Sequence, residues 1–564
     1  MIELHPALPL FAGALLGGVT SGRSRAVVLL AAPLLGALLL TQLSSGDRVN
    51  WEVLGLSLSL VRVDRLALLF GYLFHLAAFL GVIYALHLRD RLQDMAALSY
   101  AASAVGAVFA GDLATLFIFW ELLAVTSCGL ILARRTPRAL RSGLRYLLVQ
   151  VGSGVLLMVG VLLYAGEGRG LAFEHIGLGA SGGVLIFLAF GIKSAFPLLH
   201  GWLTDAYPEA TPTGTVFLSA FTTKVAVYCL ARGFAGTEAL VYIGAVMTCF
   251  PIFYAVIEND LRRVLAYSLI NQIGFMVVGI GIGTELALNG AVAHAFNDVI
   301  FKGLLLMTMG AVLQVTGEMR GSELGGLYKR MPRTTFFCLI GAASISAVPL
   351  FSGFVSKSMV MSAVVGEGYF GVWLALLFAS AGVFHHAGIK IPFFAFFAHD
   401  SHFVATAREP PVNMQLAMAL AAGLCVLIGT FPGWLYGALP YPLDYSPYDA
   451  GHVLAQLQLL VFSALAFTWL KLSGIYPPEL RSVNIDAEWV YRRGLGIGVE
   501  RLQAVFGPWD RRLRGLGRSL VARAIALLAR HHGVHGVLAR SWPTGSMVLW
   551  VSVLLGTSLL LYYV

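Results

Sequence analysis

Charged residues are scarce in this sequence, and that scarcity excludes a soluble protein. Asp, Glu, Lys and Arg make up only 12% of the 564 residues, whereas soluble domains carry roughly 25%. The apolar residues fall in blocks of about 20, the length at which a helix crosses a ~30 Å hydrocarbon layer. These blocks lack the alternating pattern of outer-membrane strands. We therefore expect an all-α integral membrane protein.

Cysteine motifs and nucleotide-binding loops are also missing. The five cysteines lie singly inside apolar blocks, and no two have the CxxC spacing of an iron–sulfur or zinc site. The sequence contains neither a GxxxxGK[ST] loop nor a dinucleotide fingerprint. We expect no cofactor, no metal and no nucleic-acid partner. The first residues lack a basic region and continue into apolar sequence, which favours a first membrane helix over a cleaved signal.

About 16 apolar blocks can be counted along the chain. They fall near residues 7–20, 26–41, 66–88, 94–110, 112–133, 143–165, 181–199, 213–233, 240–257, 263–283, 288–315, 334–353, 370–398, 412–437, 453–473 and 546–563.

The orientation of these spans follows from the basic residues, which accumulate in cytoplasmic loops. With the N-terminus outside, the cytoplasmic loops hold 28 of the 38 Lys and Arg residues and the opposite loops hold six, Lys357 among them. We therefore expect a multi-pass protein of the cytoplasmic (inner) membrane with both termini on the outer, periplasmic side.

The four remaining basic residues are all lysines within apolar blocks: Lys193, Lys224, Lys302 and Lys390. A desolvated lysine can lose its proton, whereas an arginine effectively cannot. This separation of the two cation types is what a proton relay requires. The alternative is that some of them extend to the membrane surface near helix ends, and Lys390 is the strongest candidate for that.

Acidic and histidine side chains accompany these lysines. Glu121 lies well inside its span, and burying an unpaired carboxylate is expensive. His294, Asp298 and Lys302 are spaced at i, i+4 and i+8, so they stack on one helix face and can pass protons through water.

Prolines accompany two of the lysines. Lys193 is followed by Pro197, and His200 lies seven residues after the lysine, which predicts the same helix face. Lys390 stands beside Pro392, with His386 one turn earlier. Broken helices at membrane depth line ion paths, and one Lys–Pro pattern in each half suggests two repeats.

A basic stretch of about 70 residues separates the last two spans. Between residues 495 and 540 its apolar residues recur at alternating steps of three and four, with arginines opposite. This pattern indicates an amphipathic helix on the membrane surface or along partner subunits, with a kink or break at Gly507-Pro508. A soluble coiled coil is the alternative.

Six segments resemble the antiporter-like subunits shared by respiratory complex I, membrane-bound hydrogenases and Mrp-type sodium/proton antiporters. They are VDRLALLF (63–70), FWELL (119–123), GIKSAFPLLHGWLTDAYPEATPTG (191–214), NDLRRVLAYSLINQIGFM (259–276), HAFNDVIFKGLLL (294–306) and PLFSGFVSK (349–357). The segment TGTVFLSAFTTKVAVY is most similar to the Mrp D subunit, whereas the C-terminal stretch resembles the largest complex I antiporter subunit.

The resemblance implies roles for individual residues. Glu121 and Lys193 match the family's glutamate–lysine pair, and Lys224 matches the lysine that connects it onward. His294 and Lys302 match the central relay, and Lys390 matches the terminal lysine. Asp298 stands where many members have a second histidine, so this step is tuned by an acid or by sodium.

The resemblance also implies an organisation of the chain. It has N-terminal helices (1–90), two inverted-repeat halves with broken helices (91–233 and 240–400), accessory helices (401–475), an amphipathic lateral region (476–545) and a final span (546–564). The implied partners are other membrane subunits, the lipid bilayer, H⁺ and, as one option, Na⁺.

Three functions fit these residues. The chain is an antiporter subunit powered by ion gradients, a pump module powered by redox subunits, or a scaffold whose channel is inactive. The four buried lysines argue against the scaffold, because idle buried charges should be lost. The resemblance to the Mrp D subunit favours a transporter over an enzyme. A bicarbonate-uptake complex also uses this family and remains an alternative.

Overall fold

The computed structural model describes residues 4–46, 48–53, 56–480, 484–533, 536–537 and 543–563. The chain divides into two units, Met1–Glu488 and Trp489–Val564. Helices dominate both units, as the composition predicts. Twelve helices of the described residues are long and apolar enough to cross a membrane, and Leu8–Val19 and Gly183–Lys193 are shorter apolar helices.

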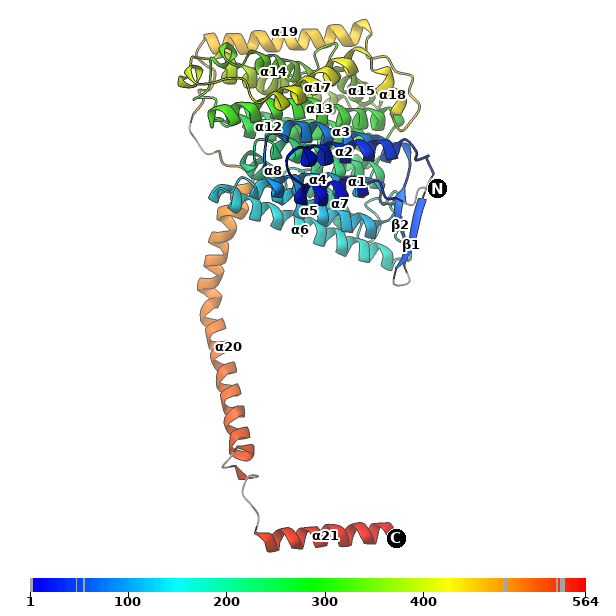
Figure 1. Cartoon of the computed structure of the whole chain (residues 1–564), viewed down its shortest axis with the longest axis vertical. Coiled ribbons are helices and arrows are strands. Elements are labelled where there is room, and N and C mark those ends of the chain that lie inside the picture. The colour runs from blue at the N-terminus through cyan, green and yellow to red at the C-terminus, as the bar shows by residue number, and fades with distance from the viewer. Residues whose placement is uncertain are drawn as a thin grey trace. The chain divides into compact units, whose positions relative to one another are not determined.

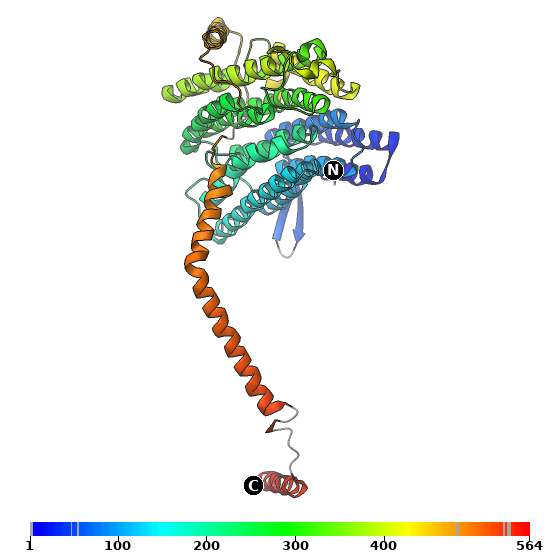
Figure 2. The ribbon, with the colours of Figure 1, turned by 90° about the vertical axis from the view of Figure 1, so that its left-hand side faces the viewer.

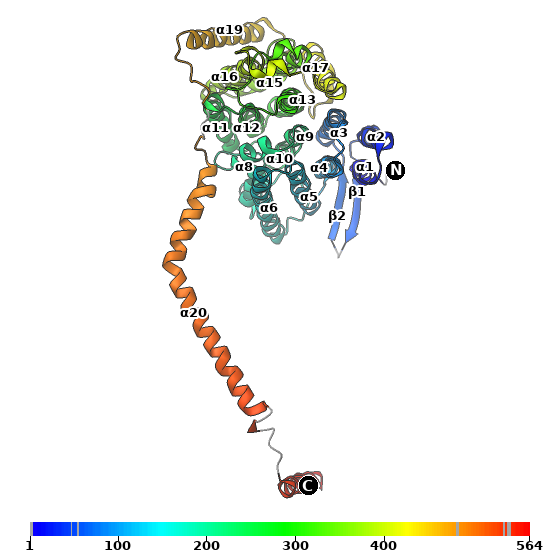
Figure 3. The same ribbon diagram turned by 60° about the vertical axis from the view of Figure 1, so that its left-hand side comes forward.

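The first unit contains the helices that surround the buried charges, and they run side by side (Figures 1 and 3). In chain order its α-helices are α1 (Leu8–Val19), α2 (Gly22–Leu40), α3 (Arg65–Ala85), α4 (Arg91–Phe109), α5 (Leu113–Leu132), α6 (Pro137–Gly166), α7 (Gly183–Lys193), α8 (Gly201–Ala206), α9 (Gly214–Ala220), α10 (Thr222–Gly233), α11 (Glu238–Ile257), α12 (Leu261–Ile282), α13 (Glu285–Thr316), α14 (Pro332–Ile345), α15 (Ser352–Gly366), α16 (Phe370–Val383), α17 (Val412–Thr430), α18 (Gly433–Ala438) and α19 (Ala450–Leu472).

Aspartates begin several of these helices at the ends of the apolar blocks. The side chains of Asp64, Asp112 and Asp260 accept hydrogen bonds from main-chain N–H groups in the first turns of α3, α5 and α12. The first N–H groups of a helix have no partner within the helix, so such a cap satisfies them where the chain enters the membrane.

Small residues let α11 and α12 pack closely. A Cβ atom at Gly274 would lie 2.7 Å from the main-chain nitrogen of Thr248 and 2.8 Å from the oxygen of Gly244. Close backbone approach at glycines is typical of helix pairs in membranes, where packing rather than the hydrophobic effect holds helices together.

A β-hairpin interrupts the helical pattern. Strands β1 (Arg48–Val53) and β2 (Leu56–Arg62) pair antiparallel between α2 and α3 (Figure 1). The apolar blocks alone predict a loop here. They do not reveal the hairpin because both strands are short and much of β1 is exposed.

Two helices are broken in the same way. Between α7 and α8 the chain turns through Ala195 and Leu198, both with positive φ, and between α14 and α15 it turns through Ala347 and Leu350, also with positive φ. The two turns share the sequence Ser-Ala-x-Pro-Leu. Left-handed backbone is costly for residues with a Cβ, so this shared geometry marks two equivalent positions.

The second break therefore falls at residues 346–351, and not at Lys390 and Pro392 as the Lys–Pro pattern suggests. Around Lys390 the helix widens instead into two π-helical turns, Phe384–Lys390 and Phe393–Phe397. The helix α15 (Ser352–Gly366) is also a correction, because the apolar blocks place most of it in an outer loop. A proline and small polar residues interrupt the apolar run there.

The α-helices among the described residues of the second unit are α20 (Leu495–His532) and α21 (Thr544–Tyr563), which Figure 2 draws in orange and red. Large apolar side chains of α20 are exposed, among them Leu502, Phe506 and Leu513. The chain is helical over most of the predicted amphipathic stretch, and residues 534–535 and 538–540 of that stretch lie outside the described residues. Pro508 lies inside α20 without ending it, so of the expected kink or break the helix does not break there.

The membrane orientation can be tested by cysteine labelling in intact cells. Arg138, in the first turn of α6, and Ser446, before α19, are both exposed and belong to loops predicted on opposite sides. In a chain without native cysteines, an impermeant maleimide should modify a cysteine at position 446 and spare one at position 138. Labelling of position 138 alone would reverse the orientation.

Candidate functional site

The first predicted pair, Glu121 and Lys193, lies where α5, α6 and α7 meet. Lys193 is fully buried at the end of α7 and donates a hydrogen bond of 2.6 Å to the main-chain oxygen of Trp120. Its ammonium also lies 4.2 Å from the centre of the Trp120 ring. The indole face and the carbonyl thus stabilise the ammonium inside the membrane.

Glu121 is half-buried, and its Oε1 atom has no hydrogen-bond partner in the described part of the chain. It interacts electrostatically with Lys193. The carboxylate rests against Gly154 of α6, where an added Cβ would lie 1.4 Å from Oε1. The glycine therefore leaves the space that Glu121 occupies.

His200 does not share a helix face with Lys193, contrary to the prediction from their spacing. The helix breaks between them, because Pro197 lacks an N–H and the neighbouring backbone is left-handed. His200 instead precedes α8 on the far side of the break and is buried.

The centre of the site is an ion pair between the two predicted halves. Lys224 of α10 and Asp298 of α13 lie 2.5 Å apart through Nζ and Oδ2, and both side chains are fully buried. Lys224 also donates to the main-chain oxygen of Ser219. Asp298, the residue that departs from the family pattern, is thus the counterion of the connecting lysine.

The column on α13 forms as the i, i+4, i+8 spacing predicts, and all three of its residues are fully buried. Lys302 donates a hydrogen bond of 2.7 Å to Ser268 on α12. His294 lies within hydrogen-bond distance of Ser356 on α15 and Gln272 on α12, at 3.0 and 3.1 Å. The column therefore touches both neighbouring helices through polar groups.

Lys357 is a fifth buried lysine, and the charge count places it wrongly in an outer loop. It lies on α15, is 3% exposed and donates to the main-chain oxygen of Ile345. It interacts electrostatically with Asp298. The signal that could have found it is the Ser-Ala-x-Pro-Leu sequence just before it, which repeats the one beside Lys193.

Lys390, the last residue of the π-helical turn Phe384–Lys390, lies against the C-terminal end of α11 and is not part of the α13 column. Its Nζ donates hydrogen bonds of 2.7 Å to the main-chain oxygens of Val256 and Glu258. It also pairs with Glu479 at 2.9 Å, with both side chains buried. It is therefore buried rather than extended to the membrane surface. His386, fully buried, interacts electrostatically with both Lys302 and Lys390.

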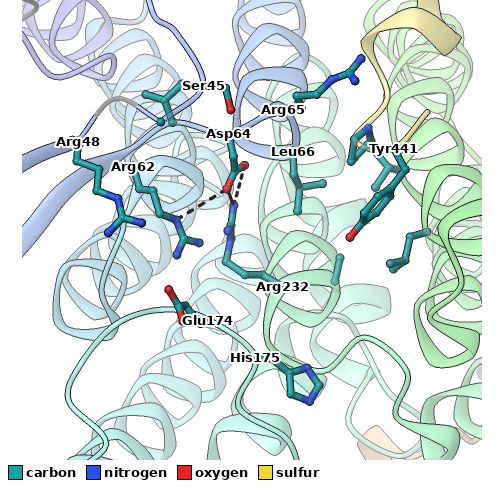
Figure 4. A pocket seen from close by; sticks show the side chains of 16 residues that line it. Ser45, Arg48, Arg62, Asp64, Arg65, Leu66, Glu174, His175, Arg232 and Tyr441 are labelled. Carbon is teal, nitrogen blue, oxygen red and sulfur yellow. Dashed lines mark hydrogen bonds and ion pairs between the residues drawn. The ribbon is translucent and has the colours of Figure 1, made fainter. Parts of the chain in front are cut away.

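A cavity of about 640 Å³ lies at the face predicted to be periplasmic (Figure 4). Arg232 pairs with Asp64 at 2.7 Å in its wall. Burial raises the pKa of the Asp64 carboxyl, against the Ala67 amide and Arg62, which lower it. Leu288 and Val292 of α13 line the cavity, so it reaches the N-terminal part of the helix that carries the column.

These groups form a membrane-embedded array of lysines, carboxylates and histidines that can hold and pass protons. In all, five of the seven lysines are buried, and Lys329 and Lys471 are the two that are not. None of the described His, Cys, Asp and Glu residues group as they would to hold a metal ion. Ionisable side chains buried among membrane-spanning helices are typical of ion-transporting membrane subunits.

Comparison with protein families assigns the chain within this class. Residues 110–384 match the model of the NADH:quinone oxidoreductase/Mrp antiporter transmembrane region. Over 345 residues the chain is 30% identical to the D subunit of the Na⁺/H⁺ antiporter from Alkalihalophilus pseudofirmus, a match that covers 57% of this chain and 69% of that protein. The chain belongs to this antiporter-like membrane family.

Another relative carries the name of a hydrogenase. Hydrogenase-4 component B of Escherichia coli is 28% identical over 357 residues, which cover 56% of this chain and 53% of that protein. The chain thus spans about half of that relative's length.

Two solved structures share the fold. A chain of the Mrp complex from Dietzia sp. DQ12-45-1b aligns with a TM-score of 0.70 and 21% identity, covering 82% of this chain and 99% of that one. A chain of an archaeal membrane-bound sulfane sulfur reductase aligns with a TM-score of 0.70 and 20% identity, covering 99% of both chains.

The Lys224–Asp298 pair predicts a specific pattern of stability. Removing one partner of a buried ion pair leaves an uncompensated charge and costs about 3–5 kcal/mol, whereas removing both can be neutral. Asp298→Asn and Lys224→Met should each lower the thermal unfolding temperature in detergent, and Lys224→Met with Asp298→Leu should restore it.

A matched control is Asp400→Asn, which breaks the exposed Lys329–Asp400 pair. It should leave the unfolding temperature unchanged, since surface pairs contribute about 0–1 kcal/mol. If Asp298→Asn were as stable as the wild type, Asp298 would not be the counterion of Lys224.

Proposed function

We propose that this chain is the proton-translocating component of a multisubunit monovalent cation/proton antiporter with Na⁺ as the exchanged cation. The observation that carries the proposal is the buried Lys224–Asp298 ion pair, which links a lysine of the first half to the relay column of the second. The relative from Alkalihalophilus pseudofirmus supports the antiporter assignment, because its name gives that activity and 345 residues of this chain align with it.

Protons are proposed to move along the buried groups in chain order. Glu121 and Lys193 form the first step, and Lys224 and Asp298 carry the charge between the halves. The central and last steps use the remaining buried bases, which are His294, Lys302, Lys357, His386 and Lys390. No step needs a cofactor, because lysine, histidine and carboxylate side chains exchange protons directly or through water.

The position of the Glu121 carboxylate controls whether Lys193 holds or releases its proton. When Glu121 approaches Lys193 it stabilises the protonated amine, and when it moves away the buried amine is destabilised and releases its proton. Lys193 has a neutral partner in the Trp120 carbonyl, so it can remain in place in either state. Movement of one carboxylate then controls the protonation of the next lysine.

A redox-driven pump module is the second candidate function. It is favoured by the hydrogenase-4 relative and by the sulfane sulfur reductase chain, whose alignment extends over 99% of this chain. The same buried groups would serve, with partner subunits supplying the energy. In both functions the proposed partners are other membrane subunits in the cell's inner membrane.

The first-half pair can be tested by transport in everted vesicles that contain the assembled complex. Glu121→Ala and Lys193→Ala should abolish cation-driven proton movement, because each removes one charge of the coupled pair. Glu121→Asp should retain part of it. Lys329→Ala, at an exposed lysine, should transport normally. Normal transport by Lys193→Ala would contradict the relay.

The energy source can be tested in the same vesicles. An antiporter changes the pH of the lumen on addition of Na⁺ without any electron donor. If proton movement required an electron donor and ignored Na⁺, the redox-driven function would replace the antiporter.

The second unit is proposed to anchor the protein in its complex. If α20 is a lateral amphipathic helix, its exposed apolar face is covered by lipid or partner helices, since burial stabilises by ~25 cal/mol per Å². Its arginines would meet anionic headgroups, at about 1 kcal/mol each.

Deleting residues 489–564 should therefore leave membrane insertion intact and reduce co-purification with partner subunits. The truncation keeps every buried relay residue. If the truncated chain assembled normally but lost transport, residues 489–564 would belong to the ion path.

A further inference from the structure

The segment between α19 and α20 brings two carboxylates into the first unit. Residues 473–480 and 484–488 of this connector are described, and within them the side chains of Glu479 and Asp486 are only 5% and 4% exposed. The sequence pattern points to neither residue, because both lie outside the apolar blocks. Burying two carboxylates requires partners, since an unpaired buried charge is expensive.

Asp486 contacts two residues of the first unit, His200 before α8 and Tyr267 on α12. His200 Nε2 lies 3.1 and 3.2 Å from its two carboxylate oxygens, and the hydroxyl of Tyr267 on α12 donates to Oδ2 at 2.7 Å. The His200 ring packs on Phe250 of α11, with ring centres 4.7 Å apart. The three polar groups thus form a buried carboxylate–imidazole–phenol cluster.

The carboxylate of Asp486 is ionised in the resting state of this cluster. Burial raises its pKa, but hydrogen bonds from His200 and Tyr267, together with the charge of His200, bring the pKa below its ordinary value. Tyr254, Glu258 and Arg263 are further titratable groups that face the cluster. Asp486 is therefore an anion beside an imidazole, a group that can both accept and release a proton.

His200 directly precedes α8, on the C-terminal side of the break in the first broken helix. One nitrogen, Nε2, faces Asp486, while Nδ1 is buried and has no hydrogen-bond partner in the described residues. Lys193 ends α7 at the other side of the same break. In the sequence His200 therefore lies between Lys193 and α8. In space its imidazole contacts the Asp486 carboxylate of the connector.

We propose that Asp486 and His200 form the proton-loading site of the first half, on the face predicted to be cytoplasmic. Asp486, an anion at rest, takes a proton from water and passes it to Nε2 of the His200 tautomer that carries its proton on Nδ1. The imidazolium that forms releases the Nδ1 proton toward the amine of Lys193, which leaves the ring protonated on Nε2 and the carboxylate ionised again. One proton enters and one leaves, and the ring returns by exchanging tautomers. This inference rests on the proposed function, and it makes a residue outside both repeat halves part of the path.

The competing explanation is that the pair only fastens the connector. The neighbouring Lys390–Glu479 pair and the packing of Tyr476 against Phe467, with ring centres 5.3 Å apart, also hold it in place. If these contacts are sufficient, loss of Asp486 leaves the connector in place; if the Asp486–His200 pair is what holds it, loss of Asp486 releases the connector. A cysteine pair at positions 467 and 476 can report that seating by its crosslinking yield.

The experiment measures proton flux in proteoliposomes with the purified complex that contains the full chain. Asp486→Asn should reduce the flux at least about tenfold, in line with the loss of a proton-transfer group. Asp486→Glu should restore most of it. The control Asp400→Asn removes an exposed carboxylate that is also paired with a base, and it should match the wild type.

The crosslinking yield at positions 467 and 476 should be the same in the wild type and in Asp486→Asn. If Asp486→Asn lost both flux and crosslinking, the Asp486–His200 pair would have a structural role only, and the proposal would be overturned. Unchanged flux in Asp486→Asn would overturn it as well, provided that Lys193→Ala is inactive. If the wild type itself moved no protons, the proposed function would fail first.

Discussion

The burial of five lysines inside a membrane protein is the constraint on which the rest of this structure depends. An ammonium in hydrocarbon is costly, so each lysine must be given a partner. Asp298 supplies the central one through its ion pair with Lys224. Because Lys224 lies on α10 and Asp298 on α13, the contact that neutralises the charge also holds together two helices that are far apart in the sequence.

Three of the other lysines are stabilised by main-chain oxygens. Lys193, Lys357 and Lys390 all donate to carbonyl groups, and for Lys357 and Lys390 these carbonyls lie at helix ends. A carbonyl stabilises an ammonium without cancelling its charge, so such a lysine can lose its proton at a lower cost than one held by a carboxylate alone. Broken and ending helices thus provide the polar groups that a proton carrier requires in a membrane.

The connector before α20 adds a further constraint. It pairs Glu479 with Lys390 and Asp486 with His200, so one short segment contacts two parts of the first unit that are distant in the sequence. Lys390 can lie buried at the end of α11 because this segment brings a carboxylate to it. The connector therefore has a role in the first unit beyond joining it to the helices that follow.

The sequence by itself determined the membrane class, most of the spans and the α13 column, because apolar block length and i, i+4 spacing are local properties. It also identified the family through contiguous motifs. It could not place Lys357 or the second break, since Pro349 and small polar residues obscure a span that tertiary packing completes. It linked His200 to the wrong helix face, because a break in a helix cancels any argument from spacing. Asp486 lies 286 residues from His200, and only the tertiary structure could bring such distant residues together, because buried charges select their partners in space and not along the chain.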